Sequence, residues 1–448
     1  MRKNITPQML EEIISKCQEA IQRNPRNVTA HHDLGVAYME KGDVDAAIEC
    51  FKKALDLNPR HVSARYLLGI AYAEKADLDR AIEQWKMVVK ADPRHAHAHY
   101  FLGKVYTLKG MWDAALYAFK KALESGGSHS LIYVHMGEVH LAKGEMQQAV
   151  SAWRKALELN PKELRARHNL TAAYLDMKQY DKAIEEGTKA LELGSDHSGL
   201  HYNLALSYLA KGQYGNAEKH LRRVVEQAPE DAAARVNLGE VLALQGRLDE
   251  AVKEWQRALE IDPRDKNAHY NLGLALVQQG RVDEAVGCWR KVLEIDPRFA
   301  PARNNIAVAH VFRGDLEQAA SEWMKALQIE PENLNFILNV AELRLRQGRW
   351  DEAAAYIDRA LSIEPNDQRA LMLKGIRQIR KGDHRGAAES WAAAAGDDPN
   401  FALKFAAVAR ACLNEKLLDW FINQEGIQPT AREAARGLRS LLEADRKS

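Results

Sequence analysis

The 448-residue chain has little of what marks several protein classes. Its cysteines, Cys17, Cys50, Cys288 and Cys412, are scattered and form no Cys-x-x-Cys pair, which excludes a disulfide-rich secreted scaffold and leaves no zinc-binding motif. No apolar run approaches the roughly 20 residues that a membrane-spanning helix needs. No apolar stretch follows the basic residues near the N-terminus, so no secretory signal is visible. We therefore expect a cytoplasmic protein without direct membrane insertion.

An excess of charge of one sign is also missing. The 63 Lys and Arg residues balance 62 Asp and Glu residues, which leaves a formal net charge of +1. Because phosphate binding needs a basic excess on one face, nucleic acid is not expected as a partner. The sequence also has no glycine-rich phosphate loop, Gly-x-Ser-x-Gly elbow, His-Glu-x-x-His or Cys–His signature. We therefore expect neither an enzyme nor a bound cofactor.

What the sequence does contain is a period of 34 residues. A small residue recurs at this interval without an insertion: Gly35, Gly69, Gly103, Gly137, Thr171, Ala205, Gly239, Gly273, Ala307, Ala341 and Gly375. An alanine follows each of them after twelve residues, from Ala47 to Ala387, and proline closes nine of the eleven units. Length alone suggests about three domains, but a fixed period predicts one array of stacked repeats.

Each unit is predicted to form two helices. In the unit 232–265, one stripe of the first helix is apolar: Val236, Leu238, Val241 and Leu242. Gly246 follows as the stop, because glycine adopts the left-handed conformation at little cost. The second helix carries apolar residues at helical spacing: Ala251, Trp255, Ala258 and Leu259. Pro263 ends it, since proline removes a donor and disfavours helix at the preceding residue.

These units resemble tetratricopeptide repeats, whose pattern is Trp, Leu-Gly, Tyr, Ala, Phe, Ala and Pro at fixed offsets. The first unit shows it as His31, Leu34-Gly35, Tyr38, Ala47, Phe51, Ala54 and Pro59. The resemblance implies an all-α fold, a right-handed α-solenoid superhelix of antiparallel helix pairs. It covers residues 28–401 as eleven repeats. We expect a capping half repeat at 1–27 and degenerate capping helices at 402–448.

We number the residues of each unit from 1 to 34, with Val28 as position 1 of the first unit. The resemblance implies a concave groove lined by positions 2, 5, 6, 9, 12 and 13. Position 6 is asparagine in six successive units: Asn169, Asn203, Asn237, Asn271, Asn305 and Asn339. A column of amides offers donors and acceptors to the backbone of an extended peptide. It is similar to the asparagine ladder of O-linked N-acetylglucosamine transferases. The alternative is a common family residue that bonds within its own repeat.

Two further residue types are predicted to line the groove. Tyrosine occupies position 5 at Tyr66, Tyr100, Tyr202 and Tyr270. With aliphatic residues such as Leu274 and Val308, they predict a surface for hydrophobic side chains; packing within the repeats is the alternative. Near the C-terminal end, four arginines could anchor an acidic or phosphorylated segment: Arg346, Arg369, Arg377 and Arg380. Arginine suits such groups, although a solvated outer edge is favoured.

Two other sets of aromatic residues have a structural interpretation. Position 24 is tryptophan in six units: Trp85, Trp153, Trp255, Trp289, Trp323 and Trp391. We predict a buried ring beside the alanines, with each indole N–H finding a local acceptor, rather than an aromatic binding surface. His95, His97 and His99 have an alternate spacing that suggests a metal site. However, His99 occupies the ordinary aromatic position 4, so no metal is expected.

The pattern as a whole predicts a non-catalytic scaffold or adaptor. Its partner would be an extended peptide or a segment of a partner protein, bound in the groove. The alternative is a permanent subunit of a larger multiprotein complex. Position 5 never carries lysine and position 9 never carries asparagine, so we do not expect the carboxylate clamp of chaperone-binding tetratricopeptide domains.

Overall fold

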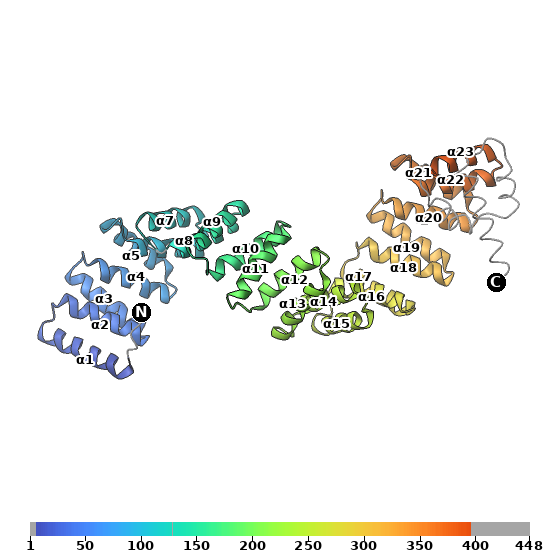
Figure 1. The fold of residues 1–448 in the computed structure, drawn as a ribbon. Coiled ribbons are helices and arrows are strands. Elements are labelled where there is room, and N and C mark those ends of the chain that lie inside the picture. Colours follow the sequence, from blue (N-terminus) through green and yellow to red (C-terminus); the bar gives the residue numbers. More distant parts are fainter. Residues whose placement is uncertain (1–5, 128, 396–448) are drawn as a thin grey trace. The chain divides into compact units, whose positions relative to one another are not determined.

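The computed structural model describes residues 6–127 and 129–395, which form 23 helices and no strand (Figure 1). Consecutive helices pack against each other as antiparallel pairs, so the fold is an all-α solenoid. The helix α1 precedes the first predicted repeat, and two helices occupy each repeat that follows. The capping helices predicted at 402–448 lie outside the described residues.

The chain divides into two compact units between Pro229 and Glu230. The helices of the first unit are α1 (Pro7–Arg23), α2 (Val28–Lys41), α3 (Val44–Leu57), α4 (Val62–Glu74), α5 (Leu78–Ala91), α6 (Ala96–Leu108), α7 (Trp112–Glu124), α8 (His129–Ala142), α9 (Met146–Leu159), α10 (Leu164–Asp176), α11 (Tyr180–Glu192), α12 (Ser198–Ala210) and α13 (Tyr214–Gln227). Those of the second unit are α14 (Ala232–Leu244), α15 (Leu248–Ile261), α16 (Lys266–Gln278), α17 (Val282–Ile295), α18 (Ala300–Arg313), α19 (Leu316–Ile329), α20 (Leu334–Arg346), α21 (Trp350–Ile363), α22 (Gln368–Arg380) and α23 (His384–Ala395).

The first helix of each repeat ends in a left-handed residue, as the sequence predicts. Gly246 has φ +80° after α14, and its amide donates to the Ala243 carbonyl oxygen at 2.9 Å. The two repeats without glycine keep the same backbone, because Ala76 and Lys178 have φ of 61° and 56°. Both residues therefore carry a steric cost that glycine avoids.

The core of each repeat forms where positions 8 and 24 meet. A Cβ atom added to Gly239 would lie 2.5 Å from Trp255 Nε1, so glycine is what lets the indole approach α14. Larger residues at position 8 stand with smaller ones at position 24 in three repeats: Thr171 with Gly187, Ala205 with Leu221, and Ala341 with Ile357. In these three repeats a larger residue on one side is matched by a smaller one on the other, whereas Ala307 with Trp323 is an exception.

The six tryptophans at position 24 are buried, which confirms the predicted ring. Five of them donate the indole N–H to the backbone carbonyl oxygen at position 5, as Trp255 does to Val236 at 3.1 Å. Trp323 differs in two neighbours, because it faces Ala307 instead of glycine and position 5 of its repeat is Asn304. Its N–H donates to the side-chain oxygen of Asn304 at 2.9 Å. Both differences accompany the change of acceptor.

Neighbouring first helices pack against each other, which places them on the inner side of the stack. Such contacts join α2 with α4, α6 with α8, α10 with α12, α14 with α16 and α20 with α22. No pair of second helices in the described part of the chain packs to this extent. The first helices therefore approach one another more closely than the second helices do.

Candidate functional site

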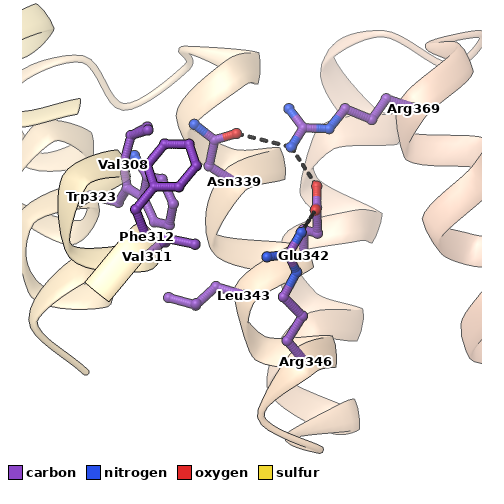
Figure 2. Close-up of a pocket in the computed structure, with 9 residues that line it drawn as sticks. All are labelled: Val308, Val311, Phe312, Trp323, Asn339, Glu342, Leu343, Arg346 and Arg369. Carbon is purple, nitrogen blue, oxygen red and sulfur yellow. Dashed lines mark hydrogen bonds and ion pairs between the residues drawn. The ribbon is translucent and has the colours of Figure 1, made fainter. Parts of the chain in front are cut away.

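Two pockets in the second unit are lined mainly by residues at positions 2, 5, 6, 9, 12 and 13 of the first helices. The first, which we name the α14–α16 pocket, has a volume of about 450 Å³. The second, the α18–α22 pocket, has a volume of about 270 Å³ and is drawn in Figure 2. The positions that the sequence assigned to a groove therefore surround hollows in this unit.

The α14–α16 pocket combines amides with exposed leucines. Asn237 and Asn271 line it at position 6, one repeat apart. Leu244 and Leu274 line it as well, and they remain 50% and 39% exposed. Asn271 makes no side-chain hydrogen bond to the described residues, so its donor and its acceptor are both open.

The six asparagines at position 6 are not equivalent. Asn169 and Asn203 belong to the first unit, and the Asn169 amide nitrogen is buried without a hydrogen-bond partner in the described structure. In the second unit, the Asn305 amide donates to the Tyr270 hydroxyl at 3.4 Å. Asn339 is engaged on both sides, because it donates to Asn304 at 3.1 Å and accepts from Arg369 at 2.9 Å. Intrachain bonds therefore occupy the C-terminal end of the column.

The four tyrosines at position 5 are partly buried and several pack within the protein. Tyr66 lies against His95, with ring centroids 4.9 Å apart. The Tyr100 hydroxyl is 3.0 Å from His135 Nε2, while the Tyr270 ring meets Phe299 edge-on at 5.3 Å. Burial raises the pKa of both Tyr66 and Tyr100. Tyr202 is partly buried as well.

The structure separates the four arginines of the predicted anchor. Arg346 and Arg369 line the α18–α22 pocket, where both bind Glu342. Arg377 instead faces Asp358 on α21 at 3.4 Å. The Arg380 guanidinium lies 5.4 Å from the centre of the Trp350 ring. Two of the four arginines therefore line this pocket.

The histidines near His95 have capping roles. The ring nitrogens of His61 and His95 accept the backbone N–H of Ala64 and Ala98, each at 3.1 Å, and so cap α4 and α6. His99 donates to the carbonyl oxygen of Pro93 at 3.0 Å. Within residues 6–127 and 129–395, no group of three His, Cys, Asp or Glu side chains is arranged to hold a metal ion.

A buried histidine pair lies elsewhere in the first unit. His201 Nδ1 and His220 Nδ1 are 2.8 Å apart, and His201 Nε2 donates to Asp196 at 2.7 Å. Asp196 also pairs with Arg223. Burial, together with the neighbouring His201, lowers the pKa of His220 to about 4. Arg223 and His201 hold the pKa of Asp196 far below its usual range.

Three strongly exposed apolar residues of the first helices are absent from the residues predicted to bind. Leu108, Leu244 and Phe312 all occupy position 13, at or next to the last residue of a first helix, and all three are exposed. The available signal was a large apolar residue at a helix end where the other repeats have charged, polar or small residues, such as Glu40, Asp176, Ala210 or Gln278. An exposed apolar residue of this kind is informative when it belongs to a larger surface.

Family models described as tetratricopeptide repeat match most of the chain. One matches residues 18–59, 32–85, 66–130 and 202–266, and the others match residues 129–195, 267–299 and 324–375. The chain is a tetratricopeptide repeat protein. Tetratricopeptide repeats are in general non-catalytic modules for protein interaction, and no catalytic family is indicated. No curated protein matches the chain.

Several solved structures are similar to this tetratricopeptide repeat protein. YrrB, described as having an unusual peptide-binding site, is 29% identical over 41% of this chain and 95% of its own, with a TM-score of 0.39. MamA from Desulfovibrio magneticus RS-1 is 23% identical over 39% and 98%, with a TM-score of 0.37. The APC/C hetero-tetramer Cut9–Hcn1 is 15% identical over 91% and 94%, with a TM-score of 0.42.

No helix among the described residues is both long enough and apolar enough to cross a bilayer.

Proposed function

We propose that this protein is a scaffold that holds an extended segment of a partner protein along its first helices. The observation that supports the proposal is the α14–α16 pocket, where two amides and two exposed leucines face one hollow. Amides suit the backbone of an extended chain, and leucines suit its side chains. Neither feature depends on a particular partner sequence.

The amides would recognise the partner's backbone. Asn237 and Asn271 occupy the same position in successive repeats, so they present the same group at a regular interval along α14 and α16. This is the arrangement that resembles the asparagine ladder of O-linked N-acetylglucosamine transferases. Asn339 does not share this role in the proposal, because Arg369 and Asn304 occupy its amide.

The leucines would supply most of the affinity. Complete burial of a leucine side chain is worth about 1.5–3 kcal/mol. Since Leu244 and Leu274 are 50% and 39% exposed, covering the remaining surface of each gives about 1 kcal/mol. Removing both side chains should therefore cost about 2 kcal/mol, or about 30-fold in Kd.

A purified partner tests the proposal. The full chain is used to capture partners, and one of them is purified and titrated by calorimetry against the wild type and the double variant Leu244→Ala/Leu274→Ala. Leu159→Ala is the matched control, because Leu159 is 52% exposed but lies on the second helix α9. We expect the double variant to bind about 30-fold more weakly and the control to bind normally. Equal affinities for all three proteins would refute the proposal.

The second candidate is a permanent subunit of a larger complex, with the same surface filled at all times. Purification separates the two: a scaffold is recovered as a free chain, whereas a permanent subunit is recovered with its complex. The cytoplasmic location, the lack of enzymatic activity and the lack of a nucleic-acid partner stay predictions.

A further inference from the structure

The α18–α22 pocket differs from the α14–α16 pocket in having one apolar side and one charged side (Figure 2). Its apolar side consists of Val308, Val311 and Phe312 from α18, with Leu343 from α20. Phe312 is 78% exposed, which is unusual for a phenylalanine in a folded protein. A single large apolar side chain would fit a hollow of about 270 Å³.

The charged side consists of two arginines that bind the same carboxylate, that of Glu342. Glu342 accepts from Arg346 at 2.6 Å through one oxygen and from Arg369 at 2.7 Å through the other. Arg369 also donates to Asn339 at 2.9 Å, which fixes its guanidinium above the pocket (Figure 2). Glu342 is only 15% exposed, so its carboxylate is held between the two arginines.

Two guanidinium groups and one carboxylate leave an excess positive charge at the pocket. Each guanidinium has five N–H donors, and the described contacts use only Nη2 of each. The remaining donors of Arg346 and Arg369 have no partner among the described residues. Arginine in this state binds a carboxylate strongly, because the hydrogen bond is charge-assisted.

We propose that the α18–α22 pocket selects partner segments that carry one large apolar residue with a carboxylate beside it. The apolar side chain enters between Phe312 and Leu343, and the carboxylate binds Arg346 and Arg369. Alternate residues of an extended chain point the same way, so an acidic residue two positions from the apolar one satisfies both. The inference rests on the proposed function and names the class of segment that this part of the surface takes.

The test measures binding of short fluorescent Gly/Ser peptides to the full chain by polarisation. The probe peptide carries one Phe and, two residues away, one Glu; companion peptides replace Glu by Gln, or Phe by Ser. A further pair ends in Phe with either a free or an amidated terminus, which distinguishes a terminal carboxylate from a side-chain one. We expect each loss, of the carboxylate or of the ring, to weaken binding about tenfold.

Variants assign the effect to this pocket. Arg346→Gln/Arg369→Gln should abolish the preference for Glu over Gln, while Arg257→Gln on the second helix α15 is the control. Glu342→Gln should strengthen binding of the Glu peptide, because it removes the carboxylate that competes for both arginines. A variant that merely loosened the helices would not bind more tightly. Equal binding of the Glu and Gln peptides to the wild type would overturn the proposal.

A photo-reactive side chain reports what fills the pocket. Benzoylphenylalanine at position 312 should cross-link the probe peptide; cross-links only within the chain, or only to a second copy, would overturn the proposal. The proposed function is tested separately. If partner binding depends on Leu244 and Leu274 but no Glu preference exists, the selectivity fails and the scaffold stands.

Discussion

Gly239 makes the sharpest prediction about how the repeats are held together. In Gly239→Ala, the new methyl group would lie 2.5 Å from Trp255 Nε1 and 2.8 Å from two neighbouring ring atoms. Ordinary contacts between such atoms are about 3.5–4.0 Å, so the indole must move by about 1 Å. Trp255 is buried and donates to the Val236 carbonyl oxygen, so movement threatens both its packing and its hydrogen bond.

The change in the free energy of unfolding follows from two destabilising effects and one stabilising effect. Overpacking a core costs about 1–3 kcal/mol, and weakening the indole hydrogen bond costs about 0.5–1.5 kcal/mol. Replacing glycine by alanine within a helix returns about 1 kcal/mol. We expect a net loss of about 1–3 kcal/mol. The native pair of Ala307 and Trp323 shows one accommodation, in which the indole N–H bonds to Asn304 instead.

Hydrogen exchange measured by mass spectrometry is the suitable assay, because repeat arrays need not unfold in one step. Peptides from α14 and α15 should exchange faster in Gly239→Ala than in the wild type. Gly287→Ala is the matched control, since Gly287 lies in α17 with nothing within 4 Å of an added Cβ. In that variant, the free energy of opening of α17 should rise by up to about 1 kcal/mol, so its amides should exchange more slowly. Equal or greater protection in Gly239→Ala would refute the packing argument.

Two further predictions concern stability. The pKa of His220 is about 4 in the folded protein and about 6.5 in the unfolded chain. Between these pH values the unfolded chain binds more protons than the folded protein. Lowering the pH from 6.5 to 4 should therefore destabilise the first unit by up to about 3 kcal/mol. Urea unfolding at several pH values should show a weaker pH dependence in His220→Leu; an unchanged dependence would contradict the assignment. Lys178→Gly removes the steric cost of a side chain at φ +56°. Hydrogen exchange of α10 and α11 should therefore slow, by an amount that corresponds to a rise of up to about 1 kcal/mol in their free energy of opening. Faster exchange would show that the left-handed conformation of Lys178 carries no cost.

Much of the fold could be predicted because the repeat encodes it many times. The 34-residue spacing of Gly35, Ala47 and their successors predicts the helix pairs. Gly246 and its equivalents predict where the first helices end, and even the exceptions Ala76 and Lys178 keep the left-handed backbone. The tryptophans were predicted to form a buried ring beside the alanines, and the structure adds that Trp255 packs against Gly239.

The candidate site was less predictable, because it depends on differences between repeats. Position 6 alone does not say that Asn339 is bound by Arg369 while Asn271 is open. Arg377 and Arg346 both lie on first helices and were assigned to the same anchor. However, Arg377 occupies position 10 and faces Asp358 on α21. Long side chains reach several partners, so spacing places their backbone and not their charged ends.

The measurement that tests the central claim most directly is photo-cross-linking from the α14–α16 pocket. Benzoylphenylalanine replaces Leu244 in one protein and Leu159, on the second helix α9, in another, and each is irradiated with the same purified partner. Binding of an extended segment along the first helices predicts a cross-link from position 244 to one short stretch of the partner and none from position 159. Cross-links from position 159 with none from position 244 would contradict it.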